Sequence, residues 1–152
     1  MQQAKFLREK LCNDYRFRHI QTAKKYCQPH FFILNKGLNS GKPLKLACPN
    51  CFVFITDNEA QMDFYYWLLY GLWKAKSFHR IHKGSVIVFI TLNDLKSLIF
   101  EASVQAREAG HMFEESIKTL KKLEQLESLY LNNLKLVNEA KRIVFHRYVQ
   151  RR

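Results

Sequence analysis

The sequence predicts an α+β domain built from a small three-stranded sheet, with an N-terminal helix and a long C-terminal helix. Three observations predict this fold. A β-rich apolar phrase ending in Phe-Ile-Thr occurs twice, at residues 52–56 and 86–91. Each copy is followed by side chains that favour the first turn of a helix. The last part of the chain, residues 111–148, contains neither proline nor glycine.

The two copies of the phrase predict strands at about 51–56 and 85–91, each running into a helix. Asp57 and Asn58 follow the first copy, and Asn93 follows the second. Such side chains accept hydrogen bonds from the free N–H groups at a helix N-terminus. A strand, a helix and a second strand in this order predict a parallel pair with a right-handed crossover.

The N-terminal region is predicted to hold a helix and one further strand. Between residues 2 and 27, apolar residues recur at helical spacing and basic residues fill most of the other positions. Pro29 closes this segment, and a β-like run at 31–35 supplies another strand of the sheet. We expect the aromatic residues of this helix to face the core. The alternative is that they stack on nucleic-acid bases beside the basic residues.

Three more helices are predicted. The first, at 58–77, is apolar on nearly every face and is expected in the core. The second, at about 93–109, ends at Gly110. The third covers 111–148 and keeps apolar residues three or four apart. Its apolar stripe predicts a partner, either a second copy in a homodimer or the N-terminal helix of the same chain.

The 152 residues are expected to form one domain with three parts: a basic helical segment at 1–28, an α/β core at 30–110, and a long amphipathic helix with a basic end at 111–152. The longest apolar run is too short to cross a bilayer, which takes about 18 to 20 residues. No leader peptide opens the chain. We therefore expect a cytoplasmic protein without membrane contact.

The net charge of +12 is concentrated at the two ends of the chain. Residues 1–45 hold ten Lys and Arg against two acids, and the last twelve residues hold five Lys and Arg and no acid. Such an asymmetry favours a polyanion as partner, through phosphate contacts and counterion release. The alternative is a charged surface that serves solubility alone.

The loop at residues 35–45 is the first candidate for phosphate contacts, because Gly37 and Gly41 expose backbone N–H groups beside lysines. The glycine spacing and Pro43 exclude a Walker loop. A second basic cluster covers 74–83, and arginines end the chain. The candidate nucleic-acid-binding residues are Lys36, Lys42, Lys45, Lys74, Lys76, Arg80, Lys83, Arg147, Arg151 and Arg152.

The segment Cys48-Pro49-Asn50-Cys51 has the spacing of half a zinc site. The candidate zinc ligands are Cys48, Cys51, Cys27 and His30, and His79 with His82 form an alternative second half. The favoured interpretation is that the cysteines are reduced thiols, so that no cofactor is needed. A thioredoxin-like redox role is disfavoured because the motif precedes a strand and does not open a helix.

Enzymatic function is not predicted. The sequence contains no signature of a serine hydrolase, a zinc protease or a dinucleotide-binding enzyme. A minor alternative is a small metal-dependent or histidine-dependent hydrolase, with His19, His30, His79 or His82 beside a distant carboxylate.

Three segments also carry a family resemblance: residues 31–44, the Cys48–Cys51 turn and the Gly84-Ser85-Val86-Ile87 run. Over residues 30–100 the chain resembles an uncharacterised family of small bacterial proteins that are often carried on mobile elements. The resemblance implies a bacterial cytoplasmic setting and an accessory role in mobile-element biology. It transfers no activity and no functional residues.

These observations together predict a non-enzymatic nucleic-acid-binding accessory protein. The alternative function is a protein-interaction or inhibitor module that uses the long C-terminal helix to bind an acidic protein partner.

Overall fold

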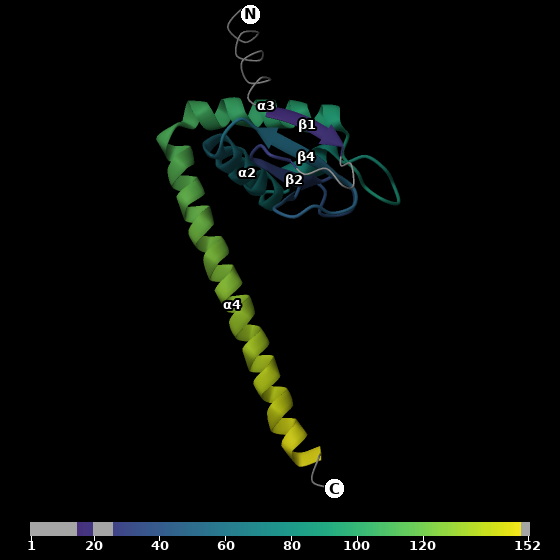
Figure 1. Cartoon of the computed structure of the whole chain (residues 1–152), viewed down its shortest axis with the longest axis vertical. Coiled ribbons are helices and arrows are strands. Elements are labelled where there is room, and N and C mark those ends of the chain that lie inside the picture. Colours follow the sequence, from purple (N-terminus) through teal and green to yellow (C-terminus); the bar gives the residue numbers. More distant parts are fainter. Residues whose placement is uncertain (1–14, 20–25, 150–152) are drawn as a thin grey trace, which may run out of the picture. The chain divides into compact units, whose positions relative to one another are not determined.

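The computed structural model describes residues 15–19 and 26–149 and has the predicted α+β class (Figure 1). The chain divides into two compact units, Met1–Gly110 and His111–Arg152. The strands are β1 (Tyr15–His19), β2 (His30–Leu34), β3 (Pro43–Leu44) and β4 (Cys51–Thr56). The helices are α2 (Glu59–Lys74), the 3₁₀ helix η1 (Ser77–Ile81), α3 (Leu92–Ala109) and α4 (His111–Val149).

The sheet has four strands in the order β1-β4-β2-β3, and every neighbouring pair is antiparallel. The prediction of three strands with a parallel pair is therefore wrong. β4 lies in the interior of the sheet, with Phe54 opposite Phe17 of β1 and Phe31 of β2. Strand β1 occupies the edge of β4 that the predicted parallel neighbour would have needed.

The predicted strand at 85–91 is a loop. Gly84 has a φ of +91°, and Phe89 pairs across the turn with Lys83 and, in a second isolated bridge, with Lys36. Val86 and Ile87 are exposed. Their apolar side chains resemble those of a buried strand in the sequence, but these residues do not join the sheet.

The predicted helix at 2–27 is wrong for residues 15–19, which form β1. Tyr15 and Phe17 face the aromatic core, whereas Arg16 lies on the other face of the sheet and pairs with Asp57 at 3.5 Å. This alternation has the period of a strand. Residues 26 and 27 are not helical either, and the other residues of the predicted helix, 2–14 and 20–25, lie outside the described residues.

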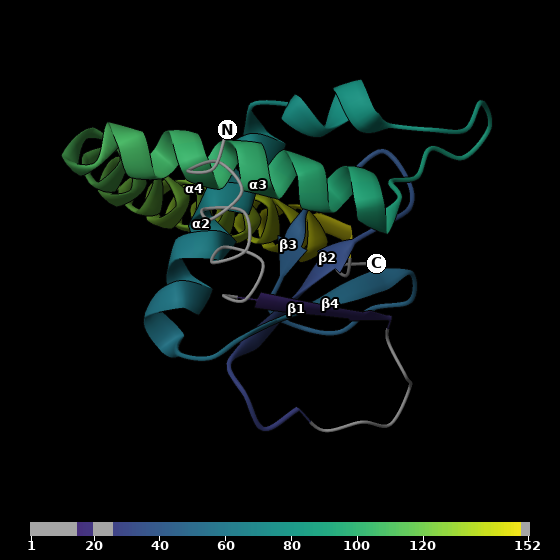
Figure 2. The same ribbon diagram turned by 90° about the horizontal axis from the view of Figure 1, so that it is seen from above.

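One face of the sheet carries an aromatic core. The Phe54 ring stacks on Tyr15 and on Phe31, with both centroids 4.8 Å away, and Tyr65 of α2 lies 5.1 Å away. Helix α2 packs on this face and α3 packs against α2 (Figure 2). Phe54 and Tyr65 are fully buried.

The other face of the sheet is also covered. Phe32, Cys51, Val53 and Ile55 form a second buried cluster. The partly buried residues packed against it are Tyr26, Leu34, Leu44 and Cys48. Because β4 is covered on both faces, all six of its residues are buried, which explains why its sequence is continuously apolar.

The predicted cap of α2 is confirmed, because the Asn58 side chain accepts a hydrogen bond from the Gln61 N–H. The predicted cap of α3 is wrong: Thr91, and not Asn93, is the N-cap and accepts a hydrogen bond from the Asp94 N–H. Gly110 ends α3 with a φ of +50°. Helix α4 runs without a break through Asn132 and Asn133. Within the described residues, no helix has the length and hydropathy needed to cross a membrane.

We predict that Phe54→Ala lowers the free energy of unfolding by about 3 to 5 kcal/mol, because it opens a cavity among the packed rings. Urea unfolding followed by circular dichroism measures the change. Leu38→Ala is the control, because Leu38 is 85% exposed and its loss should change stability by less than about 0.5 kcal/mol. Equal effects of the two changes would contradict the central position of Phe54.

Candidate nucleic-acid interface

The structure brings together the two basic segments that the sequence analysis treated separately. The Gly37 N–H donates to the Val88 carbonyl at 2.8 Å, and the Ser40 Oγ lies 2.8 Å from the His82 Nε2. Gly41, with a φ of +95°, lies so close to Phe78 of η1 that a Cβ there would overlap the ring. The loop after β2 and the segment after α2 therefore form one surface, which we call the basic junction: residues 35–42 and 73–83.

Two lysines of the basic junction lie over the same aromatic side chain. The Lys42 Nζ is 4.7 Å from the centroid of the Trp73 ring, and the Lys74 Nζ is 5.5 Å from that ring. Lys74 is also 5.5 Å from the Tyr70 ring. An ammonium over an indole face gains a cation–π attraction and keeps its full charge. Trp73 thus holds two positive charges from different parts of the chain near each other.

Two other predicted contacts are engaged in ion pairs with α3. Arg80 pairs with Glu101 at 3.1 Å, and Lys83 pairs with Asp94 at 2.6 Å. These two ion pairs link η1, and the short segment directly after it, to α3. Their positive charges are partly neutralised, so Arg80 and Lys83 are weaker candidates for phosphate contact than the sequence suggested.

Four other lysines of the prediction have no carboxylate partner among the residues that the structure describes. Within the described part of the chain, no carboxylate lies at ion-pair distance from Lys36, Lys42, Lys45 or Lys76. Lys36, Lys45 and Lys76 are exposed. Their charge is available to an anionic ligand.

The predicted arginines near the C-terminus belong to a different unit of the chain from the basic junction. Arg147 lies in α4, which belongs to the second unit. Arg151 and Arg152 lie outside the described residues.

The predicted zinc ligands are not brought together. Leu34 pairs with Cys51 and His30 pairs with Ile55, so His30 and Cys51 lie at opposite ends of the β2–β4 ladder. Four residues of strand separate them by about 13 Å. The antiparallel pairing of β2 with β4 therefore keeps His30 away from the Cys48–Cys51 turn.

Cys48 and Cys51 form a disulfide across the turn before β4. The expectation of reduced thiols is wrong for this pair, while Cys27 is an exposed free cysteine. Among the described residues, no group of three or more His, Cys, Asp or Glu is placed to hold a metal ion.

The predicted catalytic histidines are dispersed. His30 begins β2 and its Nδ1 lies 2.8 Å from the carbonyl oxygen of Gln28, which precedes the strand. His79 and His82 lie in or beside η1, with ring centroids 5.0 Å apart. His82 contacts Ser40, which resembles half of a hydrolase triad. Ser40 is only 1% exposed, however, so a substrate cannot reach its hydroxyl in this conformation. The contact instead fastens the loop to η1.

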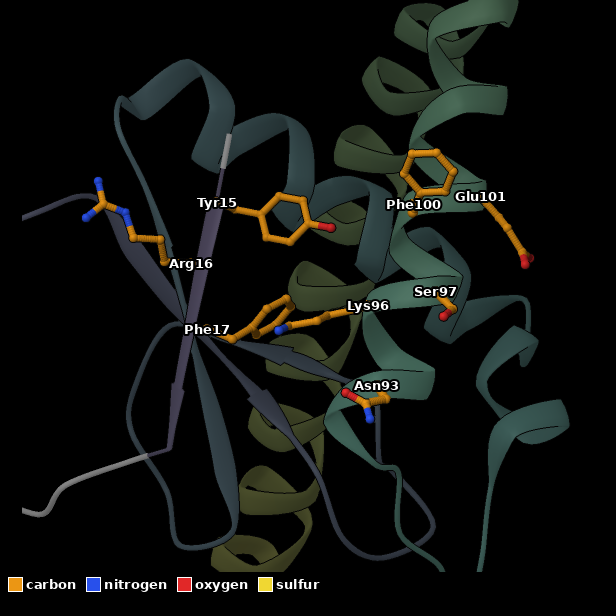
Figure 3. Close-up of a pocket in the computed structure, with 8 residues that line it drawn as sticks. All are labelled: Tyr15, Arg16, Phe17, Asn93, Lys96, Ser97, Phe100 and Glu101. Carbon is orange, nitrogen blue, oxygen red and sulfur yellow. The ribbon is translucent and has the colours of Figure 1, made fainter. Parts of the chain in front are cut away.

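A groove that the sequence analysis missed lies between β1 and α3 (Figure 3). Its volume is about 760 Å³. Tyr15 and Phe17 face it from the strand, and Lys96 and Phe100 face it from the helix. The Lys96 Nζ lies 5.9 Å from the Phe17 centroid. Rings beside an ammonium suit a ligand that is both aromatic and anionic.

The surroundings of the Asp94 carboxyl lower its pKa. The hydrogen bond from Lys83 is the largest cause, and that from Thr91 is the second; both lower the pKa of Asp94. A carboxyl with a lowered pKa stabilises the folded state above its unfolded pKa of about 3.9. This stability is lost as the pH falls through the lower, folded-state value.

We predict that Lys83→Met raises the pKa of Asp94 towards the ordinary range, because it removes the main group that favours the ionised form. Titration of the side-chain carboxyl carbon by NMR measures this change. Arg80→Met is the matched control, since it removes a neighbouring cation and leaves the Lys83 pair intact. An unchanged Asp94 pKa in Lys83→Met would contradict the assigned cause.

Comparison with known proteins gives one match. A family model described as a family of unknown function, DUF6943, matches residues 18–147. No curated protein and no solved structure matches the chain significantly.

Proposed function

Because the chain belongs to DUF6943, a family of unknown function, its own residues must indicate its role, and we propose that it is a non-enzymatic nucleic-acid-binding accessory protein of the cytoplasm. The basic junction would contact phosphates. The observation that carries this proposal is the position of Lys42 and Lys74 over the single indole of Trp73.

The proposal rests first on the charge that remains after ion pairing. Two cations of the basic junction are paired with acids of α3, but Lys36, Lys42 and Lys76 are not paired within the described residues. Lysines without carboxylate partners can contact phosphates, and each such contact releases counterions that are condensed on the nucleic acid, with a gain in entropy. The overall charge of +12 adds long-range attraction for the same ligand.

The groove between β1 and α3 supports a preference for single strands. Phe17 is half-buried, with Phe54 and Tyr15 against it edge-on and the Lys96 ammonium over its ring at 5.9 Å from the centroid. Bases of a duplex are stacked on each other, whereas bases of a single strand are free to stack on such a ring. Phe17 and Lys96 would then take a base and a neighbouring phosphate.

We predict that the triple variant Lys36→Gln, Lys42→Gln, Lys74→Gln binds nucleic acid weakly. Each lost phosphate contact lowers the slope of log affinity against log salt by about 0.7 to 0.9, so the slope should fall by about 2 to 3. Fluorescence anisotropy with random-sequence single-stranded and duplex DNA and RNA measures it, over about 50 to about 200 mM salt.

The matched control for this experiment is Lys118→Gln, Lys121→Gln, Lys122→Gln in α4, which removes the same charge from the other unit. The proposal requires the control to bind like the unmodified protein. If both variants lose affinity equally, binding depends on the net charge of the protein alone, and the basic junction is not the binding surface. If the unmodified protein binds no better than a charge-matched unrelated protein, the proposed function is wrong.

A second prediction concerns the groove. Phe17→Leu keeps an apolar side chain and removes the ring, so single-strand affinity should fall by about 1 to 3 kcal/mol, roughly 5- to 150-fold. Duplex affinity should stay the same. The same anisotropy assay reports both values, with thermal unfolding as a check that the variant is folded. An equal loss for single strands and duplexes would exclude base stacking on Phe17.

A protein-interaction module that binds through α4 is the second candidate function. It is favoured by one specific observation, the large apolar side chains that this helix exposes.

A further inference from the structure

Helix α4 carries a long apolar stripe that is exposed to solvent. Between Leu123 and Val144, the side chains at 123, 126, 130, 134, 137 and 144 are 46 to 68% exposed. The helix has 39 residues, which corresponds to about 58 Å of length. Most of the stability of helices in proteins comes from the packing of an apolar face against a partner. Helix α4 lacks this packing along its stripe as long as the stripe faces water.

The spacing of the stripe is that of a two-helix seam. From Leu123 to Val144, with Ala140 included, six steps of three or four residues cover 21 residues. The mean step of 3.5 is below the 3.6 residues of a straight helical turn. A stripe with this period stays on one side only when two helices wind around each other with a left-handed twist.

The stripe is nearly symmetric about Tyr130. Leu126 and Leu134 lie four residues to either side of Tyr130, and Leu123 and Val137 lie seven residues to either side. A two-fold axis at Tyr130 would therefore set Leu126 against Leu134 and Leu123 against Val137 of a second copy. Self-complementarity of this kind is the property that a two-fold interface requires.

The charges of α4 select the direction of pairing. Residues 111–128 contain four Glu and three Lys, a balance of −1, whereas residues 129–149 contain four Lys and Arg and one Glu, a balance of +3. A parallel pair would place the two basic halves together. An antiparallel pair places each basic half beside an acidic one, which is the favourable arrangement.

We infer that two copies of this chain associate through α4, as an antiparallel pair with its two-fold axis at Tyr130. The occupant of the apolar stripe is the same stripe of the second copy. This inference is independent of the proposed nucleic-acid binding, because it rests on the second unit alone.

The first experiment measures the mass of the full chain, freed of nucleic acid by nuclease and high salt. Sedimentation equilibrium should give twice the chain mass of 18.2 kDa. Leu126→Glu with Leu134→Glu should give the single-chain mass, because it opposes four carboxylates across the axis. Ser128→Glu, with Gln125→Glu, is the control of equal charge on the other side of the helix, and it should remain a dimer.

The second experiment tests the direction. In a background of Cys12→Ser and Cys27→Ser, Leu123→Cys and Val137→Cys proteins are mixed and oxidised, and the crosslinked species are separated by mass. An antiparallel pair gives mainly the mixed crosslink between positions 123 and 137. A parallel pair gives each variant crosslinked to itself.

Three results would overturn the inference. One is a protein of single-chain mass at every concentration, which would mean that the stripe is covered within the chain or by another partner. Another is a dimer that survives Leu126→Glu with Leu134→Glu. The last is a dimer whose crosslinks join like positions.

Discussion

The contact of Phe54 with rings from three other elements is the interaction on which the first unit depends. Phe54 lies in the interior strand β4 and stacks on Tyr15 of β1 and Phe31 of β2, while Tyr65 of α2 packs on it. Two sheet neighbours and the covering helix therefore share one residue. Because stacked and edge-on rings have restricted geometries, this contact fixes the strand register as well as the position of α2.

The position of α2 in turn creates the basic junction. The helix packs across β2, β3 and β4, so its C-terminus comes to the edge of the sheet where the loop after β2 lies. Lys42 precedes β3 by one residue, and Trp73 and Lys74 end α2. The Lys42–Trp73 contact is thus a consequence of how the helix lies on the sheet. The close approach of Gly41 to Phe78 completes the surface.

Local sequence signals predicted the helices well and the sheet poorly. The limits of α2, α3 and α4 predicted from cap residues and glycines lie close to the observed ones, because these signals act within one helical turn. The pairing of strands depends on distant contacts. Residues 52–56 and 86–91 share the Phe-Ile-Thr phrase, yet only the first has aromatic partners on both sides, and the second follows the turn at Gly84 and stays exposed at Val86.

The candidate site was predictable in its parts and not in its assembly. Glycines and lysines identified the loop, and the cluster after α2 was visible as a run of cations. The loop and this cluster form one surface because Ser40 contacts His82 and Gly41 fits against Phe78. No spacing pattern in the sequence predicts either contact. The strand direction likewise decided the zinc hypothesis, since antiparallel pairing separates His30 from Cys51. β1 was missed because an alternation of only five residues was interpreted as part of a helix.

Four cations of the basic junction are held in place by two different kinds of contact, and this difference bears on function more than the number of cations does. Arg80 and Lys83 have acidic partners on α3, so their charges serve mainly to hold η1 and the following residues in place. Lys42 and Lys74 are held by aromatic faces. A π face attracts an ammonium without cancelling its charge, so the contact with Trp73 positions the Lys42 ammonium and leaves it able to bind an anion. A surface whose only task was solubility would gain nothing from cations held in fixed positions, whereas a phosphate contact gains affinity from such preorganisation.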